Sequence, residues 1–496
     1  MVLRLLPARP YYLGPIGHAG LSVYPGRLIV DRAPLRILLG NSIAVNKEKS
    51  MNRIFYSLLI ALFILGYLPG QVDPSAGNWK TWFISSGKDY RLPAPGSYQD
   101  EIAQVLSIQQ KADETARRQI LYWNAGHPGY RWQEMMTRLW TVDTGRYGAL
   151  ANMLLGTAIY DATVVAWDSK YVHRRPRPFE ADRRIKIQIS PPESPSFPCE
   201  HSVAAGVAVS VFSAFYPSMA DSVRKLARQA MESRVAAGVA FPSDTRAGFE
   251  LGMRIAGEEI ERTRDFVCKE AWDGKIPEGP QYWRGRFTLL PMAGKNKTVV
   301  LSGSSEYRPG PPPDYAKEME ELKQYKQNFR SLSNAFQWAN ADWFGEELKK
   351  KIFEYNLHLN PPLAAYIHAA IGVGLYDGFV ACWDAKYTYW GIRPNQYDTT
   401  FRPAILVTPP FPGYPSGHAV ITAVEAGLMS YFFPEEKDRY RKKAAEAAES
   451  RFQAGIHFRS DNEAARDLGK KVAEKLVQKL NREGIPVPWR NPPGNK

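Results

Sequence analysis

The chain has 496 residues, enough for two or three ordinary domains, and its 44% hydrophobic and 23% charged residues exclude bulk disorder. Its three cysteines, Cys199, Cys268 and Cys382, are too few for a disulfide scaffold and form no CxxC pair for zinc. The 64 Lys and Arg against 50 Asp and Glu give a formal charge of +14, spread along the chain. Dispersed charge of this kind favours small anionic ligands, and we expect no nucleic-acid partner.

Residues 51–70, MNRIFYSLLIALFILGYLPG, have the pattern of a secretory signal peptide. Arg53 precedes an apolar run that is shorter than the roughly 20 residues of a membrane-spanning helix. We therefore expect an exported protein, periplasmic or secreted, with no stable membrane span in the mature chain. A short membrane anchor that is kept is the alternative. Residues 1–50 show no clear period, and we interpret them as a mis-annotated extension upstream of a start at Met51.

The body of the chain repeats itself. GTAIYDATVVAWDSKY at 156–171 matches GVGLYDGFVACWDAKY at 372–387 without a gap. From His201 and His418 onward the offset between the two copies grows by a single position and then stays the same. An offset that is constant over about ninety positions, apart from this one shift, predicts a tandem duplication, in which we expect the first repeat to pack on the second.

A Gly-, Ser- and Pro-rich stretch at 301–315, LSGSSEYRPGPPPDY, is typical of a linker between the two copies. The predicted boundaries are 79–290 for the first repeat, 291–313 for the linker and 314–485 for the second repeat.

Helical patterns fill the second repeat. Residues 419–433 form an apolar run that ends at Pro434, and residues 462–480 place apolar side chains on one face. Strand-type alternation is nearly absent. We predict an all-α fold of two tandem helical bundles related by a pseudo-two-fold axis.

The second repeat gathers charged and polar residues in three blocks, KYTYWGIRP, TPPFPGYPSGH and SRFQAGIHFRSD. Lys386, Arg393 and Arg451 are three cations that can balance an oxyanion with two or three negative charges. Ser416 and Gly417 open a helix, where backbone N–H groups can bind the same anion. These residues predict an oxyanion site.

Two histidines in these blocks need different roles. His457 and Asp461 are four residues apart on a predicted helix, so the carboxylate can hold one ring nitrogen and leave the other as a nucleophile or a ligand of a metal oxyanion. His418 can donate or accept a proton on the opposite side. One such pair is usually structural, but the joint pattern of three ordered blocks indicates a catalytic site.

The three blocks resemble the signature of the type 2 phosphatidic-acid phosphatase and vanadium-dependent haloperoxidase superfamily: Lys-x6-Arg-Pro, Pro-Ser-Gly-His and Ser-Arg-x5-His-x3-Asp. The resemblance is specific over 372–475 and reaches the first repeat through the duplication. It implies an all-helical bundle fold and His418 as the acid/base. His457 would be the covalent nucleophile or the vanadium ligand. Phosphate or vanadate would be bound by Lys386, Arg393, Ser416, Gly417 and Arg451.

The first repeat departs from this signature. Cys199 and Glu200 replace the Ser-Gly pair, and Ala240 stands in the place of His457. Because alanine cannot attack phosphorus or ligate vanadium, and Glu200 would repel an oxyanion, we predict that this repeat is not catalytic. We interpret its remaining Lys, Arg and His as a relic or a buried ion cluster; a weak regulatory anion site is the alternative.

The anion-binding residues do not separate the two branches of the superfamily. In a haloperoxidase, vanadate on His457 is the cofactor, and halide and peroxide are the substrates. In an acid phosphatase, His457 becomes phosphorylated by a phosphate ester and no cofactor is needed. Trp383 and Phe411 resemble the aromatic wall of a halide pocket, although they can equally be core aromatics. The compact spacing of His418 and Ser450 is typical of phosphatases.

We predict a haloperoxidase-like enzyme. An acid phosphatase is the alternative, and a non-catalytic anion-binding protein is the second alternative.

Overall fold

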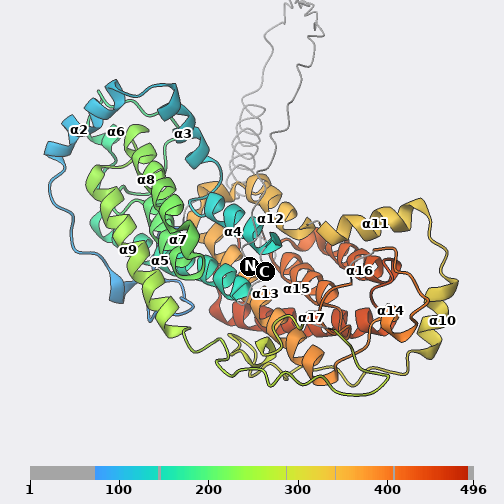
Figure 1. Ribbon diagram of the computed structural model, residues 1–496. Helices are drawn as coiled ribbons and strands as arrows, with labels where there is room; N and C mark the ends of the chain where they lie inside the picture. The colour runs from blue at the N-terminus through green and yellow to red at the C-terminus, as the bar shows by residue number, and fades with distance from the viewer. Residues whose placement is uncertain (1–72, 143–146, 286, 341, 406–407, 490–496) are drawn as a thin grey trace, which may run out of the picture. The chain divides into compact units, whose positions relative to one another are not determined.

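The computed structural model describes residues 73–142, 147–285, 287–340, 342–405 and 408–489. The predictions for residues 1–50 and 51–70 lie outside these ranges. The described residues are helical or irregular, and their one strand-type contact is an isolated bridge between Tyr282 and Gly391. The predicted all-α fold is confirmed (Figure 1).

The N-terminal set of helices, here called the N-terminal bundle, runs from residue 99 to residue 262. Its helices are α2 (Gln99–Gln110), α3 (Glu114–Asn124), α4 (Tyr130–Val142), α5 (Gly148–His173), α6 (Pro178–Ala181), α7 (Glu200–Phe215), α8 (Ala220–Ala236) and α9 (Pro242–Arg262). Short 3-10 turns lie at Pro74–Asn78, Lys88–Tyr90 and Pro217–Met219.

The C-terminal set, here called the C-terminal bundle, runs from residue 316 to residue 483. Its helices are α10 (Ala316–Gln324), α11 (Phe329–Asn340), α12 (Trp343–Glu354), α13 (Pro361–Tyr389), α14 (Pro394–Tyr397), α15 (Gly417–Phe432), α16 (Lys437–Gln453) and α17 (Arg459–Glu483). Further 3-10 turns lie at Ala293–Lys295, Leu357–Leu359 and Pro434–Glu436. The last five helices of this bundle follow the same order and near-equal lengths as α5 to α9.

The helices α5 and α13 are central because they are apolar on nearly all sides. A helix with no polar face is stable in a globular protein only when other helices surround it. The stretches Gly148–Ala181 and Pro361–Tyr389 are long and apolar enough to cross a membrane, yet their most apolar windows are 94% and 89% buried inside the protein. They are therefore explained as core helices.

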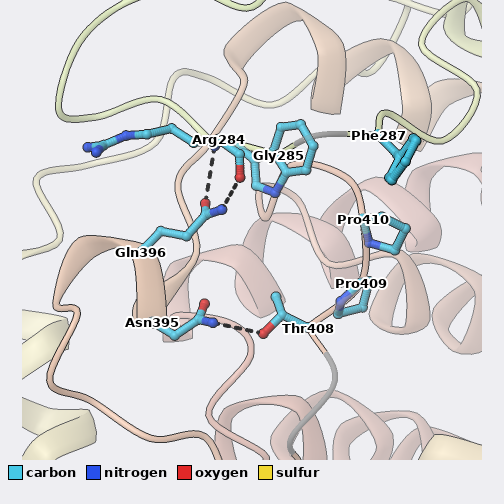
Figure 2. Close-up of a pocket in the computed structure, with 9 residues that line it drawn as sticks. Arg284, Gly285, Phe287, Asn395, Gln396, Thr408, Pro409 and Pro410 are labelled. Atoms are coloured by element: carbon cyan, nitrogen blue, oxygen red, sulfur yellow. Dashed lines mark hydrogen bonds between the residues drawn. The ribbon is translucent and has the colours of Figure 1, made fainter.

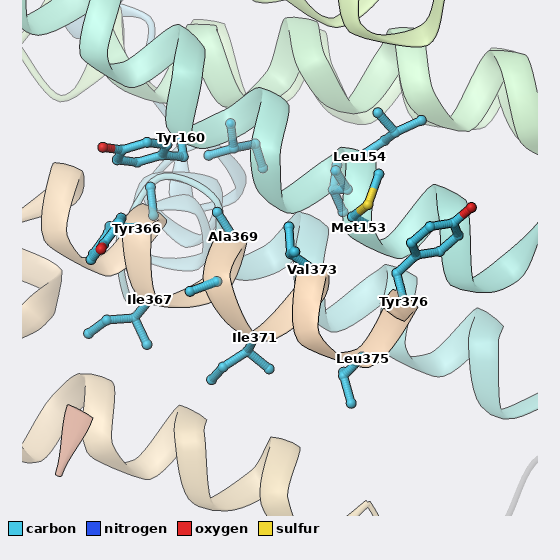
Figure 3. Close-up of a cluster of buried hydrophobic side chains, with 14 of the residues drawn as sticks. Met153, Leu154, Tyr160, Tyr366, Ile367, Ala369, Ile371, Val373, Leu375 and Tyr376 are labelled. Atoms are coloured by element: carbon cyan, nitrogen blue, oxygen red, sulfur yellow. The ribbon is translucent and has the colours of Figure 1, made fainter. Parts of the chain in front are cut away.

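Figure 3 shows α5 and α13 packed against each other. A Cβ added to Gly156 would lie 3.3 Å from the Cα of Ala369, and one added to Gly372 would lie 3.4 Å from the Cα of Met153. Glycine at these positions lets the two backbones approach closely. In the aligned copies Gly156 corresponds to Gly372, and Met153 corresponds to Ala369. This reciprocal pattern, in which each helix presents the same patch to the other, is that of a two-fold axis.

The segment at 291–313, predicted to be a linker, packs against α13. The backbone N–H groups of Val299, Val300 and Leu301 donate to the carboxylate of Asp377 on α13, at 2.7 to 3.1 Å. In the N-terminal bundle, the carboxylate of Asp161 on α5 accepts from the N–H groups of residues 82–84 in the same way. Each bundle thus holds the chain that precedes it, while the repeat boundaries themselves stay predictions.

Candidate active site

The predicted cations Lys386 and Arg393 lie on either side of a sharp reversal of the chain. Lys386 is in the last turn of α13, and the C-cap residue of this helix, Trp390, has the left-handed conformation, with a φ of 51°. Residues other than glycine rarely adopt positive φ. The reversal turns the chain back so that Arg393 becomes the N-cap residue of α14.

Lys386 fixes the loop that leads into α15. Its buried ammonium donates to the carbonyls of Pro412 at 2.8 Å, Gly413 at 2.9 Å and Pro415 at 2.5 Å. Burial lowers the pKa of Lys386 to about 7. The buried ammonium of Lys386 therefore holds the loop before α15 against α13 through these three hydrogen bonds.

Arg393 joins this loop to the one that precedes α17. Its guanidinium donates to the carbonyl of Phe411 at 3.1 and 3.2 Å and to that of Ile456 at 2.8 Å. Its Nη1 also lies 3.0 Å from Nε2 of His457. Because a guanidinium only donates, Nε2 is the acceptor and carries a lone pair. The proton of the neutral imidazole is therefore assigned to Nδ1.

Asp461 lies behind the imidazole. Its Oδ2 is 2.9 Å from Nδ1 of His457 and also accepts the N–H of Phe458 at 3.1 Å, in the first turn of α17. Its Oδ1 accepts the hydroxyl of Tyr315 at 3.1 Å. A buried carboxylate fixed in this way sets the tautomer and the direction of the ring. The His-x3-Asp spacing thus becomes an oriented imidazole with its lone pair turned toward Arg393.

The other predicted residues surround the same place. Arg451, in the last turn of α16, donates to the hydroxyl of Ser450 and to the carbonyl of Ala335, each at 2.9 Å. Among the described residues no acceptor contacts its Nη1. Ser416, the N-cap residue of α15, has a buried hydroxyl without a hydrogen-bond partner in the described part of the chain. The site therefore keeps polar hydrogens that protein atoms do not satisfy.

Positive charge is in excess here. Burial lowers the pKa of Arg393 to about 10 and that of Arg451 to about 10. Burial, followed by the charges of Arg393, Lys386 and Arg451, places the pKa of His457 well below its ordinary value. Burial also raises the pKa of Asp461 to about 7, although Arg393 and Lys386 oppose that shift. A buried group of cations that faces one carboxylate favours the binding of an anion.

His418 is the exposed member of the site. Desolvation by the surrounding protein and the charges of Arg451, Arg393 and Lys386 lower the pKa of His418 to about 3. Because His418 is exposed to solvent, we attribute the lowered pKa to the three cations more than to desolvation. A bound anion would offset these charges and bring the imidazole back toward its ordinary pKa.

The two aromatic residues proposed for a halide pocket lie beside the cations. The rings of Trp383 and Phe411 are 5.3 Å apart, centre to centre. The ring centre of Phe411 is 5.0 Å from Nζ of Lys386 and 5.1 Å from Cζ of Arg393, within cation–π range. The structure thus places both rings at the edge of the anion site.

Two contributions to the site were missed from the sequence. Tyr315, which holds Asp461, is 146 residues away in the chain and carries no motif. Residues 281–285 and 287–289, assigned to the first repeat, lie along the loops of the C-terminal bundle. The N–H of Leu289 donates to the carbonyl of Pro410, and the carbonyl of Leu289 accepts from Trp383 and Tyr387. Such contacts depend on tertiary packing and leave no periodic signal.

A cavity of about 190 Å³ opens next to the anion site. Figure 2 shows the hydrogen bond from Asn395 to Thr408 and those between Gln396 and the backbone of Arg284. The bond from Asn395 to Thr408 is 3.1 Å long. The cavity shares α14 and the loop before Phe411 with the anion site, but none of the predicted site residues lines it. Its lining is Trp283, Arg284, Gly285, Phe287, Asn395, Gln396, Thr408, Pro409 and Pro410.

The N-terminal bundle preserves the framework of this site. Lys170 donates to the carbonyls of Pro195 at 2.5 Å and Ser196 at 3.3 Å, as Lys386 does one repeat later. Ala240 stands at the position of His457, and the carboxylate of Asp244 is bound by Arg175 and Ser196 instead of an imidazole. The framework is therefore kept where the candidate nucleophile is absent.

Family models match two segments of the chain. The model described as the PAP2 superfamily matches residues 148–261, within the N-terminal bundle. The model described as the VCPO second helical-bundle domain matches residues 438–483, which include His457 and Asp461. No curated protein matches the chain.

Solved structures share the fold. A bacterial vanadium-dependent iodoperoxidase is 18% identical, with a TM-score of 0.55 over 71% of this chain and 96% of its own. The holo form of a bacterial vanadium-dependent chloroperoxidase is 13% identical, with a TM-score of 0.51 over 68% of this chain and 92% of its own. Its apo form gives the same identity and TM-score. The PAP2 superfamily model thus matches part of the N-terminal bundle, the VCPO model matches part of the C-terminal bundle, and the solved structures share the all-helical fold.

Proposed function

We propose that this protein is a vanadium-dependent haloperoxidase-like enzyme whose active site lies in the C-terminal bundle. The observation that carries the proposal is the His457 imidazole. Its Nδ1 is held by Asp461 at 2.9 Å, its Nε2 keeps a lone pair, and buried cations stand around it. A protein that only captured anions would not need an imidazole oriented in this way.

The residues present fit vanadate. The lone pair on Nε2 of His457, which accepts from Arg393 in this structure, would suit vanadium as a ligand, and Lys386, Arg393 and Arg451 supply charge that an oxyanion needs. The unpartnered hydroxyl of Ser416 and the helix start at Gly417 supply hydrogen-bond donors. When bound there, vanadate would activate peroxide toward the oxidation of a halide.

The chain's own residues then have separate tasks. Asp461 keeps the proton of His457 on Nδ1, so that Nε2 stays available. His418, which reaches solvent, is placed to take a proton from peroxide or to pass one to an oxygen that leaves. Trp383 and Phe411 form an apolar wall that limits the water around the site where a halide would bind.

Paired assays test the proposal. Oxidation of iodide and bromide by peroxide, and phosphate release from an aryl phosphate, are measured with and without orthovanadate. We expect halide oxidation only when orthovanadate is added. Phosphate release that orthovanadate inhibits, without halide oxidation, would instead identify an acid phosphatase. Binding of orthovanadate without either reaction would identify an anion-binding protein.

We also propose that the protein is exported through the segment at 51–70, because the basic residue, apolar run and Pro-Gly end there have the order of a signal peptide. Sequencing the N-terminus of the protein from its native source tests this. A start shortly after residue 70 is expected. Peptides from residues 3–49 would contradict the proposed start at Met51.

A further inference from the structure

The N-terminal bundle holds a buried carboxylate where the C-terminal bundle has its anion site. Nζ of Lys170 lies 2.8 Å from Oε2 of Glu200, and Nη2 of Arg177 lies 3.3 Å from Oε1. All three residues are at most 5% exposed. Burial alone would raise the pKa of Glu200, but the charges of Lys170 and Arg177 outweigh it and hold that pKa well below its ordinary range. The two cations thus face a fixed, charged carboxylate that balances one of their two positive charges.

Glycine occupies the corresponding place in the C-terminal bundle. Gly417 is the first residue of α15, as Glu200 is the first residue of α7, and each directly precedes the histidine of its block. A Cβ built on Gly417 would meet only the Trp383 ring at 3.8 Å and Cε of Lys386 at 3.9 Å. A side chain grown there would therefore extend along Lys386 without a backbone clash. Glycine leaves open the space that glutamate fills.

The third cation of each bundle, Arg234 or Arg451, also differs in its hydrogen-bond acceptors. In the N-terminal bundle, Arg234 donates to Ser233 at 3.1 Å, Ile120 at 3.0 Å and Asn124 at 3.0 Å, so each of its nitrogens has a protein acceptor. Its counterpart Arg451 has equivalents of the first two contacts, but no acceptor at Nη1 among the described residues. Protein atoms thus accept all the hydrogen bonds of Arg234, whereas an external anion can accept one from Nη1 of Arg451.

Some polar groups of the N-terminal pocket still lack partners. Both ring nitrogens of His201 and the hydroxyl of Ser202 are buried without a hydrogen bond within the described residues. His201 lies 3.9 Å from Oε1 of Glu200. If the Glu200 carboxylate were removed, two buried cations and the His201 imidazole would surround a space in which an oxyanion could bind.

We propose that the N-terminal bundle is an oxyanion-binding site that is permanently filled by the chain's own Glu200. The protein accordingly binds one external tetrahedral oxyanion, in the C-terminal bundle, and not two. This inference does not depend on which reaction the C-terminal site performs. It also explains how a bundle that matches the PAP2 model can keep its cations without binding phosphate or vanadate.

Titration calorimetry of the full chain with inorganic phosphate tests the inference. We expect one phosphate per chain for the wild type and two for Glu200→Gly, because the vacated cations attract a second anion. Glu200→Asp is the matched control: it keeps a carboxylate at the site and should bind no additional phosphate. A folded Glu200→Gly variant with the wild-type stoichiometry, or equal gains in both variants, would overturn the inference.

The reverse exchange gives a second test that does not depend on the stability of the N-terminal bundle. Gly417→Glu should fill the C-terminal site and weaken phosphate binding at least about tenfold, a difference of roughly 1.4 kcal/mol. Gly417→Ala, which adds only a Cβ, should retain binding. Wild-type affinity in Gly417→Glu would contradict the idea that a glutamate at this position replaces an anion. A wild type that binds no phosphate would reject the proposed function, whereas a site gained in Glu200→Gly over the wild type would still support the role of Glu200.

Discussion

The two bundles have the same framework and differ in what occupies its centre. In both, a lysine near the end of the central helix binds carbonyls of the following loop, and an arginine binds carbonyls of two loops. In the N-terminal bundle Glu200 pairs with the cations and Ala240 stands at the position of His457, whereas the C-terminal bundle has Gly417 and His457. Buried cations therefore hold the loops in both bundles, with or without the histidine at the position of His457. The shared lysine and arginine therefore reflect the shared fold, whereas the residues at positions 200 and 240, or 417 and 457, distinguish the two pockets chemically.

The largest expected effect is at His457, the proposed ligand of vanadate. His457→Ala should lower turnover by at least about 10³-fold, because no other described side chain of the site presents an oriented lone pair. Steady-state halide oxidation in saturating orthovanadate measures it. The control is His173→Ala in the N-terminal bundle, where the ring contacts the carbonyl of Leu92 at 2.8 Å and the ring of Phe197. Equal activity in the two variants would place the reaction elsewhere.

The equivalent histidines of the two bundles give the most direct comparison. His418→Ala should lower turnover by about 10²- to 10⁴-fold, the usual contribution of a general acid or base. His201→Ala, at the equivalent position of the first repeat, should leave turnover close to that of the wild type. Rates for both are compared with their melting temperatures, so that loss of folded protein is separated from loss of catalysis. Similar losses at both positions would break the distinction between the bundles.

A smaller effect on orthovanadate affinity or activity is expected at Asp461 and Tyr315, which hold the His457 imidazole directly or through a hydrogen bond. Asp461→Asn should reduce orthovanadate affinity or activity by about 10- to 100-fold, because an amide no longer fixes the Nδ1–H tautomer. Tyr315→Phe removes one hydrogen bond to the same carboxylate and should cost less. Orthovanadate titrations of both variants decide this. A larger loss in Tyr315→Phe than in Asp461→Asn would show that the tyrosine acts directly on the anion.

The smallest effect is a pH dependence of anion binding. Lys386 has a pKa of about 7 when no anion is present, and a bound anion raises it. At a pH between the pKa of Lys386 without the anion and its pKa with the anion, binding is accompanied by protonation of Lys386. Anion affinity therefore falls as pH rises above about 7, by at most about tenfold per pH unit. Sulfate is the probe, because its own charge does not change in this range. Lys386→Arg should flatten the profile; an unchanged slope would assign the dependence to another group.

Local sequence was sufficient for much of this protein. The nearly constant offset between the two copies, the apolar helices and the three charged blocks predicted the all-helical fold and the residues that lie together around His457. These features are readable because helix periodicity and His-x3-Asp spacing act within a few turns of one helix. Glu200 and Ala240 in the N-terminal bundle were visible in the same way. The sequence predicted that Glu200 repels an anion and offered a buried ion cluster as one interpretation of the remaining cations, and the structure shows the carboxylate of Glu200 beside Lys170 and Arg177.

What only the tertiary structure decided are the contacts between distant segments. Tyr315 reaches Asp461, and Trp283 and Leu289 bond to the backbone of the C-terminal bundle. The helices α5 and α13 meet through reciprocal close approaches at Gly156 and Gly372. The direction of the lone pair on His457 also follows from Arg393, 64 residues away. Such pairings are set by how helices pack in three dimensions, and their residues share no short-range pattern that a single sequence can reveal.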